Sequence, residues 1–185
     1  MTSAASVGGD ARLRLFLALQ LPEATLDVLE RWRDEHLEGG RPLGRDLLHV
    51  TLAFLGYRPS RELRAIVDAL REAVAGAGPL AFEPAAWRET RSVGMIVLRD
   101  LTGEAGALAG RLHVRLDALG VYRPEPRAWL PHVTLLRFSR RPRLEPPLPE
   151  TGTFVPSGAA AYLSRLHPSG ARYEVLEAVS LNAGG

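Results

Sequence analysis

The same four-residue segment, His-Val-Thr-Leu, occurs twice, at residues 49–52 and again at 132–135. Each copy follows a stretch of helical periodicity and a loop that contains proline, so the repeated unit is a helix, a loop and a strand. Alternate residues of a strand share a face, so each copy directs its His and Thr to one side and buries its Val and Leu on the other. Two such units around an approximate two-fold axis would form one groove. The groove residues are His49 and Thr51 from the first copy and His132 and Thr134 from the second.

Two imidazoles that face one groove are suited to displacement at phosphorus. One imidazolium can protonate the leaving oxygen while a neutral imidazole accepts a proton from the attacking water or hydroxyl. Threonine hydroxyls can donate to the non-bridging phosphate oxygens. We expect no metal site, because no His, Asp or Glu stands two or four residues from either motif histidine. The alternative is a pair of core histidines on unrelated strands, and the second copy of the motif favours function instead.

Hydrophobic periodicity predicts an alternation of strands and helices. The first predicted strand, 13–21, has one buried face, and the second, 47–55, is closed by Gly56. Strands 80–87 and 93–98 are predicted to form a hairpin, and a single strand follows at 131–138. The final pair, 154–164 and 173–181, is joined by the loop 166–172. The predicted helices are 23–36, a second one that Ser60 caps and that reaches about residue 74, and 103–119. Residues 140–149 are rich in Arg and Pro and are predicted to form an irregular surface loop.

Composition excludes several classes of site. The chain has no cysteine, which rules out disulfides and thiolate chemistry and makes the cytoplasm the expected compartment. A formal net charge of only +2 argues against a DNA-coating protein. All 23 basic residues are arginines, a bias that genomic base composition explains, although guanidinium groups also bind phosphate well. No apolar stretch approaches a membrane span. Residues 1–10 are predicted to be a disordered tail, and 11–182 a single bilobal catalytic domain.

The sequence resembles the 2H phosphoesterase superfamily, and most closely its RNA 2′,3′-cyclic phosphodiesterase branch, historically called bacterial 2′-5′ RNA ligases. The resemblance runs from about residue 14 to residue 176, and the segment around His49 is its most specific part. The matching segments are Arg14-Leu15-Phe16 with Leu21-Pro22, Leu48-His49-Val50-Thr51-Leu52-Ala53-Phe54-Leu55-Gly56, Pro131-His132-Val133-Thr134-Leu135-Leu136-Arg137, and Gly170 with Tyr173-Glu174-Val175-Leu176.

The resemblance implies an α+β/α/β bilobal fold with two pseudo-symmetric, mainly antiparallel sheets around a central cleft and helices on the outer faces. It implies hydrolysis of an RNA terminal 2′,3′-cyclic phosphate to a 2′-phosphate, with 2′-5′ ligation as the reverse reaction. No cofactor is expected, because the two-histidine scheme needs none. By analogy His49 is the general acid and His132 the general base, an assignment that the sequence alone leaves open to inversion. A cytoplasmic monomer acting on RNA 3′ ends is expected. The alternatives are an RNA-end or nucleotide-binding module without turnover, and an enzyme for a small cyclic nucleotide metabolite.

Several residues could support the substrate. The resemblance favours a phosphate contact for Arg137, but strand parity puts its side chain on the buried face unless the strand ends or bulges near Leu136. Arg14 and Phe16 could hold a phosphate and stack a base, or Phe16 could instead cover a neighbouring helix. Tyr173 could bond to the nucleotide or be an ordinary cross-strand tyrosine.

Other residues are expected to have ordinary structural roles. His36 and His113 lie in predicted helices among charged residues and are expected to be solvated, and the three tryptophans are expected at the core or its rim. The segment 91–95 lacks the bulky apolar residue that close relatives usually carry there, which weakens any expectation of substrate contacts from the hairpin.

Overall fold

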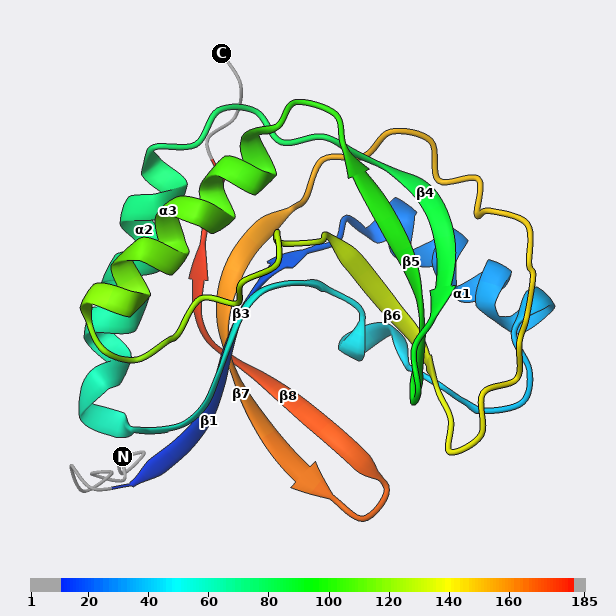
Figure 1. Cartoon of the computed structure of the whole chain (residues 1–185), viewed down its shortest axis with the longest axis horizontal. Coiled ribbons are helices and arrows are strands. Elements are labelled where there is room, and N and C mark those ends of the chain that lie inside the picture. Colours follow the sequence, from blue (N-terminus) through cyan, green and yellow to red (C-terminus); the bar gives the residue numbers. More distant parts are fainter. Residues whose placement is uncertain (1–10, 182–185) are drawn as a thin grey trace, which may run out of the picture.

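The computed structural model describes residues 11–181 and contains two four-stranded antiparallel sheets (Figure 1). Predictions for residues 1–10 and 182 concern residues outside this range. The strands of the first sheet lie in the order β3 (Val50–Pro59), β1 (Arg12–Gln20), β7 (Gly158–His167), β8 (Gly170–Val179). Those of the second lie in the order β2 (Arg41–Pro42), β6 (His132–Arg137), β5 (Val93–Asp100), β4 (Phe82–Glu89). The expected bilobal fold with two mainly antiparallel sheets is confirmed.

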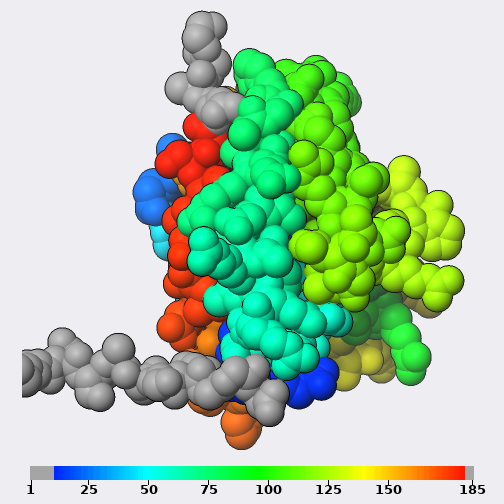
Figure 2. Space-filling view, turned by 90° about the vertical axis from the view of Figure 1, so that its left-hand side faces the viewer, coloured from blue at the N-terminus to red at the C-terminus, as the bar shows by residue number. Residues whose placement is uncertain are grey.

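The helices tie the two lobes together because two of them pack on the lobe opposite to the strand they follow. Helix α1 (Glu23–His36) follows β1 of the first sheet, yet its Trp32 packs against Trp87 of β4 in the second. Helix α3 (Glu104–Ala118) follows β5 of the second sheet and packs on α2 (Leu63–Ala75), beside β3. Figure 2 shows α2 and α3 forming one side of the molecule, with β8 next to α2. Neither lobe therefore has a complete core of its own.

Strand β1 is central in its sheet and is buried on both faces, not on one as its leucine pattern predicted. Leu15, Leu17 and Leu19 are at most 1% exposed, and the intervening Phe16 and Ala18 are at most 3% exposed. The alternating leucines predicted only one buried face because Phe16 and Ala18, which fill the second face, are not leucines, although aromatic and small residues are often buried as well.

Several element boundaries differ from prediction. The first motif strand begins at Val50, not at residue 47, and the strand before the final hairpin begins at Gly158, not at residue 154. The first motif strand does not close at Gly56 but continues to Pro59, because Gly56 adopts a positive φ of 66° beside a register shift and so bends the strand without ending it. Ser60 begins a 3-10 turn, Ser60–Glu62, and makes no capping bond to α2. The final hairpin turns over only Pro168 and Ser169, not over seven residues.

The second sheet ends in a hairpin that leaves room for an indole. Gly94 of β5 lies under Trp87, since a Cβ atom at this position would approach two ring carbons to 2.4 Å. Gly94 therefore leaves the space next to the hairpin that the Trp87 ring of the neighbouring strand β4 occupies. The Arg- and Pro-rich stretch 140–149 forms the predicted irregular loop, with no helix or strand. Among the described helices, none is long and apolar enough to cross a bilayer.

Candidate active site

His49 lies directly before β3 and is held by two hydrogen bonds. Its Nδ1 lies 2.8 Å from the carbonyl oxygen of Leu47, and its Nε2 lies 2.9 Å from Oγ1 of Thr51. A carbonyl oxygen only accepts, so Nδ1 carries a hydrogen, and in the neutral ring Nε2 accepts the hydrogen of the Thr51 hydroxyl. The shared face of His49 and Thr51 that strand parity predicted is therefore confirmed, and Val50 and Leu52 on the other face are buried.

An aromatic cluster supports the His49 ring. Phe16 lies 4.9 Å from it, and Tyr173 meets it edge-on at 5.5 Å. Phe16 also stacks on Tyr162 at 4.8 Å with an angle of 5° between the rings. Phe16 is only 3% exposed, so it offers a base almost no stacking surface. Its place in the site is under His49, as packing that fixes the ring.

Burial controls the charge of His49. Removal from water lowers its pKa from 6.5 to about 4, with smaller contributions in the same direction from the electrostatic interactions with His132 and Arg137. The hydrogen bond to Leu47 acts in the opposite direction but does not outweigh burial. In the unliganded protein His49 is consequently neutral at pH 7.

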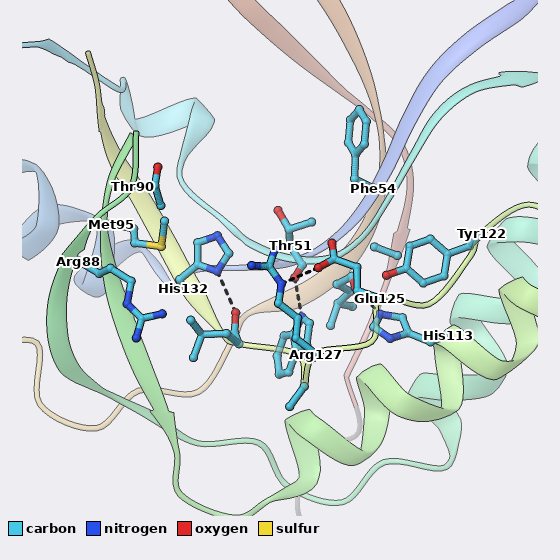
Figure 3. A pocket seen from close by; sticks show the side chains of 15 residues that line it. Thr51, Phe54, Arg88, Thr90, Met95, His113, Tyr122, Glu125, Arg127 and His132 are labelled. Atoms are coloured by element: carbon cyan, nitrogen blue, oxygen red, sulfur yellow. Dashed lines mark hydrogen bonds and ion pairs between the residues drawn. The ribbon is translucent and has the colours of Figure 1, made fainter. Parts of the chain in front are cut away.

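His132 is anchored in the same way as His49. It is the first residue of β6, and its Nδ1 lies 2.8 Å from the carbonyl oxygen of Leu130, again two residues earlier in the chain. Nε2 is therefore the nitrogen left for chemistry. Val133 and Leu135 are buried behind it, as parity predicted. Figure 3 shows the His132 ring beside Thr51 of the other motif.

Each motif contains a β-bulge at its leucine. Along β3, Leu52 is an extra residue between the pairs Ala18–Thr51 and Leu17–Ala53. Along β6, Leu135 is an extra residue between Met95–Thr134 and Gly94–Leu136. A bulge reverses the alternation of side chains beyond it. The repeat thus extends from sequence to backbone geometry.

The second bulge resolves the position of Arg137. Leu135 and Leu136 are both fully buried, and Arg137 is exposed and lines a cavity with His49 and Thr134.

Phe54 stands five residues after His49, as Arg137 stands five residues after His132. Phe54 is 49% exposed and lines the cleft, a position that the sequence did not indicate because a lone aromatic residue in a strand is usually part of the core.

Donors outside the motif strands occupy the carbonyl groups at the bulges. Nε2 of His113 lies 2.7 Å from the Leu52 carbonyl oxygen, and the backbone N–H of Leu43 donates to the Leu135 carbonyl at 2.9 Å. The indole N–H of Trp129, at the rim of the second lobe, donates to the Thr51 carbonyl at 3.0 Å. His113 is half-buried and bonded, so the expectation that it is solvated was wrong, whereas His36 is exposed as expected.

Two neighbouring cavities make up the cleft between the lobes. One, of about 520 Å³, is lined by Tyr173 and by six other predicted site residues: Arg14, Phe16, His49, Thr51, Thr134 and Arg137. No aspartate or glutamate among the described residues lines it, whereas Arg41 and His167 do. The second, of about 480 Å³, contains His132 with Arg88, Glu125 and Arg127 (Figure 3). Thr51 and Phe54 line both cavities, which are therefore parts of one cleft with a cationic section suited to phosphate.

Arg14 does not form a pair with Phe16. Its Nη1 donates to Oγ of Ser164 at 2.7 Å, and its guanidinium lies 4.7 Å from the centre of the Phe54 ring. This cation–π contact holds Arg14 at the wall of the first cavity. Within residues 11–181, no three His, Cys, Asp or Glu side chains are grouped so that they could hold a metal ion.

Comparison with known proteins shows which family this sequence and fold are similar to. Residues 19–86 match the family model described as LigT like Phosphoesterase. The RNA 2′,3′-cyclic phosphodiesterase of Escherichia coli is 30% identical over 168 residues, with 89% of this chain and 94% of the relative covered. The enzyme of the same name from Thermus thermophilus is 31% identical over 185 residues, with 91% and 90% covered.

Solved structures of similar proteins have the same fold. The crystal structure of Escherichia coli LigT complexed with 3′-AMP superposes with a TM-score of 0.78 at 24% identity, covering 94% of this chain and all of that one. The crystal structure of TT0787 from Thermus thermophilus superposes with a TM-score of 0.77 at 27% identity, covering 91% and 98%. The duplicated motif, the two sheets and these matches lead to one conclusion: the chain belongs to the LigT-like phosphoesterase family, within the 2H phosphoesterases that its sequence resembles.

Proposed function

We propose that this protein hydrolyses the terminal 2′,3′-cyclic phosphate of RNA to a 2′-phosphate, with 2′-5′ ligation as the reverse of the same chemistry. The observation that carries the proposal is the paired anchoring of His49 and His132, each through Nδ1 to a carbonyl oxygen two residues earlier. In both rings Nε2 is then the nitrogen available for proton transfer, and in His49 it exchanges its hydrogen bond with Thr51 for this role. The names of the two relatives supply the substrate class.

In the proposed reaction His132 removes a proton from water, and the water oxygen attacks phosphorus. The bond from phosphorus to the 3′ oxygen breaks as His49 donates a proton to that oxygen, which leaves as a hydroxyl group. Thr51, Thr134 and Arg137 hold the non-bridging oxygens. These side chains line the carboxylate-free cavity with His49, which supports their role.

His49 is neutral at pH 7 in the unliganded site, so as a general acid it must gain a proton when substrate binds. A phosphodiester anion near the ring raises the pKa of an imidazole. Once Nε2 carries a hydrogen it no longer accepts one from Thr51, and the Thr51 hydroxyl becomes free to donate to a phosphate oxygen. Substrate binding, protonation of His49 and reorientation of Thr51 are thus coupled in this proposal.

The low pKa of His49 equally supports the inverted assignment, with His49 as the base and His132 as the acid. A substrate with sulfur in place of the 3′ bridging oxygen separates the two, because a thiolate leaves without a proton. If His49 is the acid, His49→Ala should regain most of its rate on this substrate while His132→Ala remains slow. Rescue of His132→Ala alone would establish the inverted roles.

The activity itself is tested with an RNA oligonucleotide that ends in a 2′,3′-cyclic phosphate, incubated with the protein and EDTA. We expect a 2′-phosphate product from the unaltered protein and none from the His49→Ala, His132→Ala double variant. Absence of the product, or equal activity of the double variant, refutes the proposal. Binding of 2′-phosphorylated ends without hydrolysis would favour the binding module, and equal rates on cyclic mononucleotides and oligonucleotides would favour the small-metabolite enzyme.

One chain supplies both histidines, and we propose that the enzyme works as a cytoplasmic monomer. Light scattering coupled to size-exclusion chromatography measures the mass in solution. A mass of about 20 kDa is expected, since the chain is 20.1 kDa. A dimer mass that persists on dilution contradicts the monomer.

A further inference from the structure

Arg45 lies outside the cleft but close in sequence to His49. It begins the 3-10 turn Arg45–Leu47, and the carbonyl group of Leu47 at the end of this turn is the anchor of His49 Nδ1. The turn is closed by the Leu47 N–H donating to Gly44 at 2.9 Å. Any displacement of the turn therefore moves the group that orients the His49 ring.

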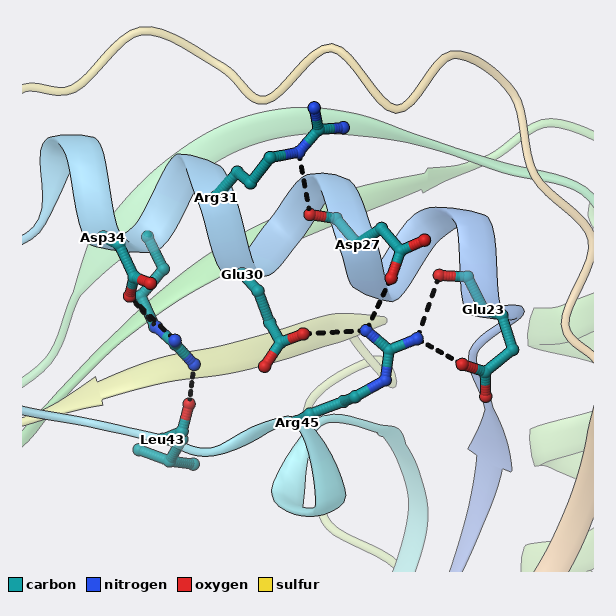
Figure 4. Close-up of polar contacts among 8 residues, drawn as sticks. Glu23, Asp27, Glu30, Arg31, Asp34, Leu43 and Arg45 are labelled. Atoms are coloured by element: carbon teal, nitrogen blue, oxygen red, sulfur yellow. Dashed lines mark hydrogen bonds and ion pairs between the residues drawn. The ribbon is translucent and has the colours of Figure 1, made fainter.

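Three carboxylates from α1 surround the Arg45 guanidinium (Figure 4). Nη1 lies 2.7 Å from Asp27 Oδ1 and 2.7 Å from Glu30 Oε2, and Nη2 contacts the Glu23 carboxylate. Nη2 also donates to the backbone carbonyl of Glu23 at 3.3 Å. Residues four and three positions apart share one helix face, so these acids form a stripe of like charge that favours a cation between them. The planar guanidinium offers several donors at once, which a lysine ammonium cannot reproduce in the same directions.

The segment that carries Arg45 also connects the two motifs. At its beginning Arg41 and Pro42 pair with β6, and the Leu43 N–H donates to the carbonyl of Leu135, the bulge residue of the second motif. Arg33 of α1 donates to the carbonyl of Leu43. Residues 41–48 thus run from the His132 strand to His49, and α1 braces them at Leu43 and at Arg45.

We propose that Arg45, clamped by Glu23, Asp27 and Glu30, is a positioning residue that fixes the His49 imidazole and its separation from the His132 motif. Exposed ion pairs contribute little to overall stability, so the main effect of the clamp is local. A misplacement of a catalytic group by about 1 Å can reduce a rate about 100-fold. The inference rests on the proposed function only through the role of His49.

The test compares Arg45→Met, the conservative Arg45→Lys, and Arg71→Met as a matched control. Arg71 also bridges two carboxylates, Asp68 at 3.3 Å and Glu177 at 3.1 Å, and it joins α2 to β8 away from the cleft. The first readout is ¹⁵N NMR of the His49 ring at pH 7 without substrate. The second is kcat and KM on an RNA 2′,3′-cyclic end.

Arg45→Met should convert the single Nδ1–H tautomer of His49 into a mixture with the Nε2–H form, because Leu47 no longer holds Nδ1. It should also reduce kcat by at least about ten-fold with KM changed less than about two-fold. Arg45→Lys should be intermediate, and Arg71→Met should match the unaltered protein in both readouts.

An unchanged tautomer in folded Arg45→Met, or a kcat equal to that of Arg71→Met, overturns the inference. The NMR comparison needs no turnover, so it still decides the role of Arg45 if the RNA substrate proves wrong. If Arg45→Met does not fold, Asp27→Asn and Arg45→Lys take its place. A normal tautomer and a normal kcat in both of these variants would refute the clamp.

Discussion

The Nε2 atom of His113 lies 2.7 Å from the carbonyl oxygen of Leu52, the extra residue of the bulge that follows Thr51. The two residues are 61 positions apart and belong to a helix and an edge strand. The contact holds α3 against the backbone of the first motif at the point where the bulge turns the strand.

Replacing His113 by alanine should leave the Leu52 carbonyl without its partner. We expect the free energy of unfolding in urea to fall by about 1–3 kcal/mol, the cost of an unpaired, half-buried polar group. His113→Gln, which keeps a donor, should recover part of this loss. The exposed His36 is the control, and His36→Ala should change stability by less than about 0.5 kcal/mol. Equal effects of the two alanine variants would contradict the role of His113.

The low pKa of His49 predicts a pH-dependent stability. The folded protein binds this proton more weakly than the unfolded chain, so the unfolded state takes up more protons between pH 6.5 and 4. The stabilisation is complete above pH 6.5 and is lost as pH falls through about 4. The stability advantage of the unaltered protein over His49→Gln should therefore shrink by up to about 3 kcal/mol between pH 7 and pH 4. Urea denaturation at several pH values measures it, and a constant difference would show that His49 titrates normally.

Thr51 has two functions in the proposed mechanism, a bond to His49 and a bond to phosphate. Thr51→Val keeps the shape but removes the hydroxyl, and kcat/KM should fall about 100-fold, the typical effect of losing one transition-state donor. Thr51→Ser, which keeps the hydroxyl, should stay within about ten-fold of the unaltered protein. Steady-state kinetics on a cyclic-phosphate RNA end tests this, and a fully active Thr51→Val would remove Thr51 from the mechanism.

Glu89 fixes the irregular loop after β6. Its side chain is 2% exposed and accepts the backbone N–H groups of Leu144 at 2.7 Å and Arg143 at 2.9 Å, together with Nε of Arg141. Burial opposes its ionisation, but these hydrogen bonds and that of Trp87 prevail and lower its pKa. Glu89→Gln should destabilise the protein by about 1–3 kcal/mol and expose the loop.

Trypsin provides the measurement, because the loop contains the cleavable bonds after Arg140 and Arg143. Cleavage there should be faster in Glu89→Gln than in the unaltered protein. Glu83→Gln, on the same strand but paired with the exposed Arg99, is the control and should be cut at the normal rate. Equal cleavage of both variants would contradict the anchoring role of Glu89.

Local patterns predicted most elements of the fold. Helix α1 has the predicted bounds because Pro22 starts it and its apolar residues keep helical spacing. The His and Thr faces of both motifs followed from the two-residue period of a strand. Family resemblance predicted the arrangement of the two sheets, which no local pattern contains.

The remainder depended on contacts between distant segments. For Arg137, strand parity and the family resemblance disagreed, and a bulge near Leu136 was one way to reconcile them. The motif residues could not decide this, because a bulge is a property of the pairing with β5. The contacts of His113 and the Arg45 clamp likewise exist only once α1 and α3 have crossed to the opposite lobe. The low pKa of His49 comes from its burial, and the aromatic rings around it belong to Phe16, Tyr162 and Tyr173 on three other strands. Their spacing in the sequence does not reveal that they meet at His49.

Strand β3 begins directly after His49 and carries Thr51 of the first His-Val-Thr-Leu segment at the free edge of its sheet. An edge strand with unpaired backbone groups is a template for pairing with another chain, and proteins avoid this by bulges and by covering the edge. Here the carbonyl groups of Thr51 and Leu52 are already occupied by Trp129 and His113, and the bulge breaks the regular ladder. The side chains that contact the motif backbone therefore also occupy acceptor groups of the edge strand that would otherwise be free to pair with a second sheet.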